Sequence, residues 1–192
     1  EKLACAFLAG LHSTGMPATA TALVTYRVVK LWADAGLLPE GTLQLLCGPA
    51  GDLLDHLGPF DVLAFTGSSG TARTLRSHPR VVGESVRVNI EADSLNAAVL
   101  APDVDLGSET GRLFLADVVR DMTQKTGQKC TAIRRVLVPA DRRADVLDGL
   151  RERLATIAIG DPSRDDVRMG PLATKAQQRD IEAGIARLAA AT

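Results

Sequence analysis

Residues 61–70 read DVLAFTGSSG. The segment Asp61–Phe65 predicts a strand, which leads directly into the small, glycine-containing segment Thr66–Gly70 and a predicted helix at Thr71–Arg76. Small residues in such a turn let backbone N–H groups approach a phosphate, and the start of the helix favours negative charge. Glycine-rich turns of this kind are common, so the stretch by itself fits an ordinary tight turn equally well.

Secondary structure on both sides of this stretch follows the same alternation. Further strands are predicted at Thr42–Cys47, Ser85–Ile90, Ala97–Ala101 and Ile133–Val138. Helices are predicted at Glu1–Gly10, Thr19–Ala35, Ala50–Leu57, Ser108–Gln124, Asp141–Ile157 and Thr174–Leu188. Alternating strands and helices indicate βα units and a mainly parallel sheet, so the predicted class is α/β, with a boundary near Glu91 between two halves.

Composition and charge argue against several functions. The chain has 46% hydrophobic and 23% charged residues, as in globular proteins, and its net charge of −1 comes without a basic stripe for nucleic acid. The apolar runs are too short to cross a membrane, and we expect no secretion signal. Cys5, Cys47 and Cys130 are too far apart for a CxxC metal or disulfide framework, which favours a reducing, cytoplasmic setting.

Both ends of the chain resemble the interior of a protein sequence. It begins at Glu1 rather than a methionine, continues directly into apolar residues, and closes on Ala189–Thr192 in a predicted helix. We therefore expect an internal piece of a longer protein. Such a piece is predicted to be poorly active by itself.

A second segment with chemical potential is Thr126–Thr131, which reads TGQKCT. It places Cys130 in a polar, glycine-containing loop after a long predicted helix. A nearby cation such as Lys129, or backbone dipoles, would increase the fraction of reactive thiolate, so Cys130 is a candidate nucleophile. Most cysteines are simply buried, and Cys5 and Cys47, in apolar segments, are predicted to be of that ordinary kind.

A third candidate is Glu91, which directly follows the predicted strand Ser85–Ile90. A carboxylate at the end of a strand can be positioned to accept a proton. Taken locally, a solvated acid or a helix cap is the more common role. Glu91 therefore gains weight only in combination with the other two segments.

The three segments together resemble the aldehyde dehydrogenase family in order and spacing. Phe65–Ser68, FTGS, is similar to the nucleotide-binding turn of that family, and Gly127–Cys130, GQKC, is similar to its nucleophile loop. Glu91 falls where the family keeps its general base. Three further landmarks occur in the family's order: Leu38–Gly41, Gly160–Pro162 and Met169–Leu172.

This resemblance implies a fold and a set of site residues. Residues 1–90 would be the C-terminal part of a Rossmann-type nucleotide-binding domain, and 91–192 the N-terminal part of the catalytic domain. NADP or NAD would be the cofactor, the substrate a small aldehyde, and the complete protein a homo-oligomer. The implied catalytic residues are Cys130 and Glu91, and the implied cofactor-binding residues are Gly48, Gly51, Phe65, Thr66, Gly67 and Ser68.

Two details of the motifs narrow the resemblance. Most of the family has Glu-Leu-Gly-Gly around the base, whereas Glu91–Asn96 reads EADSLN and Lys125–Arg135 reads KTGQKCTAIRR. These variants are similar to the dehydrogenase domains of the bifunctional phenylacetate-degradation enzymes that open the oxepin-CoA ring. That group oxidises a CoA-linked semialdehyde to the acid, usually with NADP. Related CoA-semialdehyde dehydrogenases of aerobic benzoate breakdown share these motifs, which leaves the exact substrate open.

Other functions remain open at the level of sequence. Met16 stands where the family usually has a lysine that binds the adenosine ribose or its phosphate. The choice between NAD and NADP as cofactor is therefore left open. An enzyme that keeps Cys130 but transfers the acyl group to free CoA would need no water-activating Glu91. An inactive dehydrogenase remnant would bind no nucleotide. A plain nucleotide-binding module gives the Cys130 loop no role.

Overall fold

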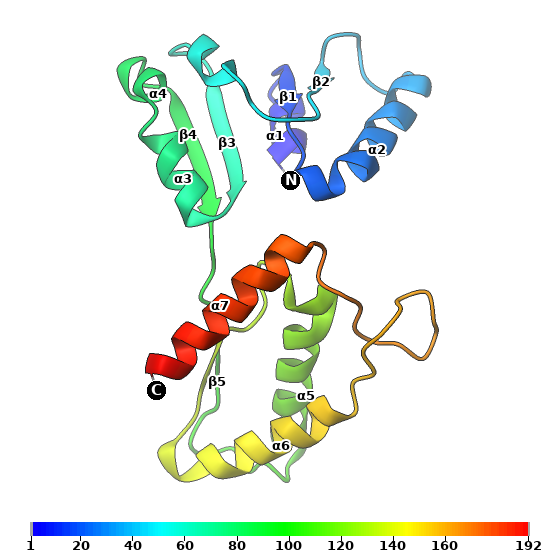
Figure 1. Cartoon of the computed structure of the whole chain (residues 1–192), viewed down its shortest axis with the longest axis vertical. Coiled ribbons are helices and arrows are strands. Elements are labelled where there is room, and N and C mark those ends of the chain that lie inside the picture. Colours follow the sequence, from blue (N-terminus) through cyan, green and yellow to red (C-terminus); the bar gives the residue numbers. More distant parts are fainter. Residues whose placement is uncertain (1, 192) are drawn as a thin grey trace. The chain divides into compact units, whose positions relative to one another are not determined.

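The computed structural model describes residues 2–191 and confirms an α/β fold with parallel strands (Figure 1). The chain divides into two compact units, residues 1–92 and 93–192, so Glu91 belongs to the first unit. Within the described residues the strands form three parallel pairs instead of one continuous sheet. Four of the strands are only three residues long, which limits each of them to a single short ladder.

The first unit contains two strand pairs with helices between their strands. Strand β1 pairs with β2, and β3 pairs with β4. The elements are α1 (Lys2–Leu8), β1 (Ser13–Gly15), η1 (Thr19–Thr21), α2 (Ala22–Asp34), β2 (Leu43–Leu45), η2 (Leu53–His56), β3 (Val62–Gly67), α3 (Ser69–Arg76), α4 (Pro79–Gly83) and β4 (Arg87–Ala92).

Glycines end the first two helices, as their sequence positions predict. Gly10 and Gly36 have φ angles of 71° and 62°, in the left-handed region that other residues rarely adopt. Beyond Gly10, the backbone N–H of Leu11 donates to the carbonyl of Ala6 at 2.9 Å and closes the last turn of α1. The predicted start of this helix at Glu1 lies outside the described residues.

Over residues 93–191, the second unit contains one strand pair and three α-helices. Strand β5 pairs in parallel with β6. The hydroxyl of Ser108 caps α5 by accepting the backbone N–H of Gly111 at 3.1 Å. The elements are β5 (Ala97–Val99), α5 (Glu109–Thr123), η3 (Gln124–Gly127), β6 (Arg135–Leu137), η4 (Ala140–Arg142), α6 (Arg143–Ala155) and α7 (Lys175–Ala191).

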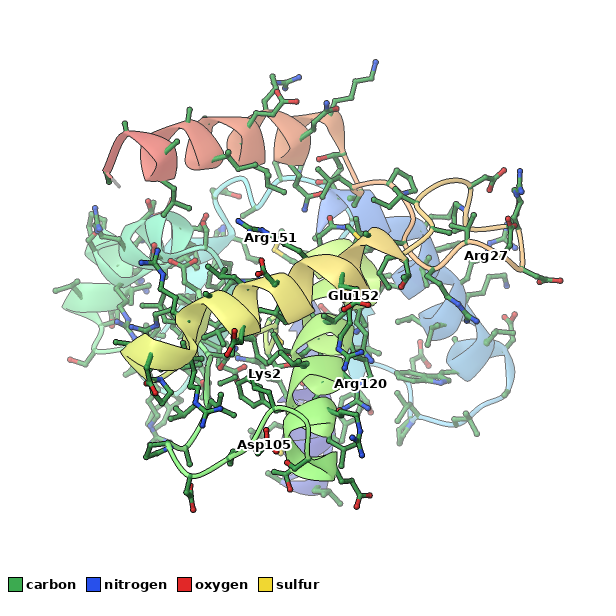
Figure 2. The ribbon with its side chains drawn as sticks, turned by 90° about the horizontal axis from the view of Figure 1, so that it is seen from below. Lys2, Arg27, Asp105, Arg120, Arg151 and Glu152 are labelled. Atoms are coloured by element: carbon green, nitrogen blue, oxygen red, sulfur yellow. The ribbon has the colours of Figure 1, made fainter. Side chains whose placement is uncertain are left out.

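The core of the second unit lies between α5, α6 and the β5–β6 pair. The helices approach closely because α6 has a glycine at the contact: a Cβ on Gly149 would lie 2.9 Å from Leu115 Cδ1. The charged side chains of Arg120, Arg151 and Glu152 extend outward from these helices (Figure 2). Helix α5, which leads into the Cys130 segment, is thus anchored in the core, whose buried members are Leu100, Leu115, Val118, Val119, Val146 and Leu150.

Several predicted boundaries differ from the structure. Strand β3 continues through Gly67 and β4 through Ala92, so Glu91 lies inside a strand and not after it. The predicted helix at Ala50–Leu57 is reduced to the 3₁₀ turn η2. Helix α4 was not predicted, because its five residues, which begin with Pro79, are too few to show helical periodicity. In the part of the chain that the structure describes, no helix is both long enough and apolar enough to span a membrane.

Candidate active site

Strands β3 and β4 bring the predicted nucleotide-binding turn Phe65–Ser68, which we call the cofactor turn, next to the predicted base Glu91. In their parallel register Thr66 lies opposite Glu91, and Gly67 lies opposite Ala92. These positions are the carboxyl ends of both strands, where open α/β sheets bind their ligands. Two of the three predicted segments therefore meet at one edge of the first unit.

The turn from β3 into α3 is built around Gly67. A Cβ atom on Gly67 would overlap the ring of Phe65, whose Cε atoms would lie at 3.1 and 3.2 Å from it. Ser68 caps the helix, because its Oγ accepts the backbone N–H of Thr71 at 3.3 Å. The small side chains and the start of the helix together give a backbone that a phosphate can approach.

Lys2 is a member of this cluster that was not predicted from the sequence. Its ammonium nitrogen lies 3.2 Å from Glu91 Oε1 and donates a hydrogen bond of 3.2 Å to the carbonyl of Phe65. The Lys2 side chain is 28% exposed and that of Glu91 60%, so the pair is partly open to solvent. Lys2 thus connects the two strands, and no local pattern near the start of the chain indicates this contact.

Gly48 and Gly51 occupy a different strand end. They follow β2, whose partner is β1, and have φ angles of 140° and 54°. A Cβ on either residue would meet no atom within 4 Å, so backbone conformation rather than crowding favours glycine there. Strand pairing does not connect them to Thr66 and Glu91, and their predicted cofactor role stays a prediction.

The third predicted segment, around Cys130, lies in the second unit. We call residues 128–134, between η3 and β6, the thiol loop. Just before it, Lys125, Thr126 and Gly127 have φ angles of 52°, 58° and 69°, three successive residues in the left-handed region. For a residue other than glycine this conformation costs about 1–2 kcal/mol. The chain therefore reverses sharply after α5, at an energetic cost that surrounding contacts must offset.

Asn96 holds the centre of the thiol loop. Its side-chain amide donates to the carbonyl of Cys130 at 3.0 Å and to that of Ala132 at 3.4 Å. The backbone carbonyl of Asn96 accepts the backbone N–H groups of Arg134 and Arg135 at 2.8 and 3.2 Å. One residue before β5 thereby fixes both Cys130 and the entry to β6.

Asp121 holds the loop from the side of α5. Its Oδ1 accepts from Lys129 Nζ at 2.8 Å, and its Oδ2 accepts the backbone N–H of Ile133 at 2.9 Å. The hydrogen bond from Lys129 is the main cause that lowers the pKa of the Asp121 carboxyl below its usual value. Lys129, the cation predicted to favour the Cys130 thiolate, thus has its ammonium group paired with Asp121, and its effect on the thiol stays a prediction.

The segment before α7 supports the same region. The hydroxyl of Thr126 donates to the carbonyl of Gly170 at 3.1 Å. The Gln128 side-chain oxygen accepts the backbone N–H of Ala173 at 3.2 Å. The landmark Met169–Leu172 thus lies against the start of the thiol loop, although 44 residues separate Thr126 from Gly170.

Exposure alone does not distinguish the cysteines. Cys130 is exposed, but so are Cys5 and Cys47, and the prediction that the latter two are buried is wrong. The first unit has few buried side chains, so its apolar segments do not enclose their cysteines. What distinguishes Cys130 is the backbone around it, which is held by Asn96, by Asp121 and by the segment before α7. Among residues 2–191, no group of three or more His, Cys, Asp or Glu residues is arranged to hold a metal ion.

Comparison of the fold gives the class of protein. The betaine aldehyde dehydrogenase of Staphylococcus aureus, solved in complex with NAD+, superimposes with a TM-score of 0.85 at 24% sequence identity. The superposition covers 96% of this chain and 36% of that one. The fold is therefore an aldehyde-dehydrogenase-like α/β fold.

Comparison of the sequence gives the family. The profile of the aldehyde dehydrogenase family matches residues 1–191, and the chain belongs to that family. It is 48% identical over 188 residues to the 3,4-dehydroadipyl-CoA semialdehyde dehydrogenase of Aromatoleum evansii, covering 98% of this chain and 36% of the relative. It is 31% identical to the alpha-ketoglutaric semialdehyde dehydrogenase of Bacillus subtilis, covering 92% and 35%. The chain thus spans about a third of the length of these relatives.

Proposed function

We propose that this chain supplies the cofactor turn and the nucleophile loop of an NAD(P)-dependent aldehyde dehydrogenase that oxidises a CoA-linked semialdehyde to the carboxylic acid. The observation that carries the proposal is the thiol loop, in which an exposed Cys130 is held by Asn96 and flanked by the contacts of Asp121. A thiol that attacks a carbonyl must be both accessible and fixed in position. Membership of the aldehyde dehydrogenase family supports this role for it.

Cys130 begins the proposed reaction as the nucleophile. Its thiolate forms a bond to the aldehyde carbon, and the carbonyl π electrons move to the oxygen to give a thiohemiacetal oxyanion. The backbone N–H of Cys130 is a donor for that oxyanion, and it is useful only if the loop backbone is preorganised. Loss of hydride from the same carbon leaves a thioester on Cys130.

Glu91 completes the proposed reaction by activating water. It takes a proton from water as the oxygen attacks the thioester carbon, the C–S bond breaks, and the acid leaves with the thiolate regenerated. In the structure the Glu91 carboxylate is tethered by Lys2 beside the cofactor turn. We propose that Lys2 orients Glu91 for this proton transfer.

The strand-turn-helix geometry of Phe65–Ser68 supports the proposal that this turn binds a dinucleotide. Gly67 leaves no space for a Cβ because the Phe65 ring lies there, and the start of α3 follows at the ends of two parallel strands. Phe65, Thr66, Gly67 and Ser68 would hold the cofactor here, with Gly48 and Gly51 at the end of β2 as further candidates. When bound, NAD(P) supplies the acceptor for the hydride.

The substrate class is supported by the relatives and by the motif around Glu91. The relative with 48% identity is named for a CoA-linked semialdehyde, whereas the relative with 31% identity is named for a free keto-acid semialdehyde. The variant EADSLN at Glu91–Asn96 supports a CoA-linked substrate, because it resembles the motif of CoA-semialdehyde dehydrogenases. We therefore propose a CoA-thioester semialdehyde of aromatic degradation as the substrate.

The complete protein that contains this chain provides the test. Cys130→Ser is expected to lower the turnover of a CoA-linked semialdehyde by at least about 1,000-fold, because the covalent route is lost. Cys5→Ser and Cys47→Ser are the matched controls and should keep turnover within about two-fold. Turnover is measured as reduced nicotinamide formed with NAD and with NADP. Full turnover in Cys130→Ser would refute the proposal.

Glu91→Gln separates hydrolysis from acyl transfer to CoA. We expect a single burst of reduced nicotinamide followed by slow turnover, because the thioester forms but water is no longer activated. Mass spectrometry of the variant should then show acylated Cys130. Acid formation at the normal rate would contradict the hydrolytic role of Glu91, and an acyl-CoA product formed with added CoA would favour the acylating reaction.

A further inference from the structure

We infer that Asp121 is a positioning residue for Cys130, a carboxylate that straps the thiol loop to α5 on both sides of the thiol. The inference rests on the proposed role of Cys130 as the nucleophile. Asp121 lies on the helix predicted at Ser108–Gln124. No sequence motif surrounds it, and the proposed reaction gives it no other role. Its two contacts are with Lys129 and with Ile133.

The geometry of Asp121 sets it apart from the other acids of α5. One oxygen accepts from the side chain of Lys129, the residue before Cys130, and the other accepts a backbone N–H from Ile133, three residues after it. A single carboxylate therefore spans the segment that carries the thiol. Both side chains of the pair are partly sheltered, 30% exposed for Lys129 and 20% for Asp121. Charge-assisted hydrogen bonds in such a setting are shorter and stronger than neutral ones.

Helix α5 makes this strap rigid. Asp121 follows Val118 and Val119, both buried in the core, so the carboxylate is carried by a well-packed helix. The loop it holds starts from Lys125 and Thr126 in the left-handed conformation and needs contacts that offset that cost. Gln124 accepts a further hydrogen bond from Lys129 Nζ at 3.2 Å and keeps the ammonium on the α5 side of the loop.

The expected consequence is specific to the reacting thiol. A displacement of about 1 Å of a reacting group can cost on the order of 100-fold in rate. Breaking the strap should therefore lower the rate of thioester formation while leaving the cofactor turn, which is in the other unit, unchanged. We expect Asp121→Asn to lower kcat by about 10- to 100-fold, with KM and cofactor affinity within about two-fold.

The experiment uses the complete protein and four variants. Asp121→Asn keeps an oxygen for the Ile133 N–H but loses the ion pair, and Lys129→Met removes the pair from the other side. Their double variant should lose no more activity than either single variant if the two act as a unit. Asp117→Asn is the matched control, because Asp117 is on the same helix but pairs at 2.9 Å with Arg120, away from the loop.

A second measurement is independent of activity. Hydrogen exchange followed by mass spectrometry on peptides covering residues 129–138 should show faster exchange in Asp121→Asn and Lys129→Met, and unchanged exchange in Asp117→Asn. Wild-type kcat in Asp121→Asn would overturn the inference. So would a lower Tm with kcat unchanged, since that is a purely structural effect. Full activity in Cys130→Ser would instead refute the proposed function, and the exchange result would still show whether Asp121 straps the loop.

Discussion

Removal of the Asn96 amide is the most direct perturbation of the thiol loop. Asn96→Ala deletes the two hydrogen bonds to the carbonyls of Cys130 and Ala132, at 3.0 and 3.4 Å, while the Asn96 backbone bonds to β6 can remain. Asn96→Asp keeps the shape of the side chain but replaces a donor by a carboxylate facing two carbonyl oxygens. Asn96→Ala therefore tests the loss of the two hydrogen bonds, and Asn96→Asp tests the effect of a negative charge facing the same carbonyls.

The size of the effect follows from these two contacts. A typical intramolecular hydrogen bond contributes a net 0.5–1.5 kcal/mol or so, and the longer bond to Ala132 counts for less than the one to Cys130, so about 1–2 kcal/mol holds the loop. Such a free energy changes the population of a correctly placed thiol by about 5- to 30-fold. We expect kcat to fall by about this factor in Asn96→Ala and further in Asn96→Asp, where like partial charges oppose each other.

The assay is steady-state turnover in the complete protein, with KM and cofactor affinity measured in parallel. The matched control is Asn89→Ala, which removes an exposed asparagine of β4 in the other unit. A fall in kcat at constant KM supports the reasoning, because the loop positions the thiol rather than binding substrate. Normal kcat in both Asn96 variants would refute it, and would mean that the remaining contacts hold the loop without the amide.

Two further predictions concern the cofactor turn and pH. Gly67→Ala should weaken NAD(P) binding by at least about ten-fold in titration calorimetry, because the new Cβ displaces the Phe65 ring, whereas Gly83→Ala, with no atom near its Cβ position, should not. Unchanged affinity in Gly67→Ala would argue against the turn as the cofactor site. The lowered pKa of Asp121 means that its charged form stabilises the fold; this contribution is complete above the usual aspartate pKa of about 3.9 and is lost as pH falls through the lower folded value. The stability difference between wild type and Asp121→Asn in urea should therefore stay level at higher pH and shrink as the pH falls below about 4, and a constant difference at low pH would contradict the assignment.

Local signals in the sequence were sufficient for most of the secondary structure. Ser108 caps α5 and Gly10 and Gly36 end helices, each through contacts within a few residues, so these boundaries could be predicted. Helix α4 and the full length of β4 could not, because the first is too short for periodicity and the second depends on pairing with β3. The residues' propensities for secondary structure do not indicate which strands pair with each other.

The candidate site shows the same division between local and distant information. Cys130 and Glu91 could be proposed from their local segments and the family resemblance. Lys2, Asn96 and Asp121 could not, because each acts through a partner outside its own segment: Lys2 bonds to Phe65, 63 residues away, and Asn96 to Cys130, 34 residues away. In sequence, Asp121 is an ordinary acid on an amphipathic helix, and only the fold shows that it faces the loop.

Asn96 and Asp121 have one role in common, because both hold the loop that carries Cys130. Lys125 and Thr126 hold the left-handed conformation that reverses the chain after α5, and this is unfavourable by about 1–2 kcal/mol per residue. The hydrogen bonds from Asn96 and to Asp121 are of comparable size and contribute to offsetting this cost. The position of Cys130 therefore depends on several weak long-range contacts acting together. Because these contacts hold the loop and not the core, loss of any one of them should affect thiol placement, and hence kcat, before it affects the stability of the core.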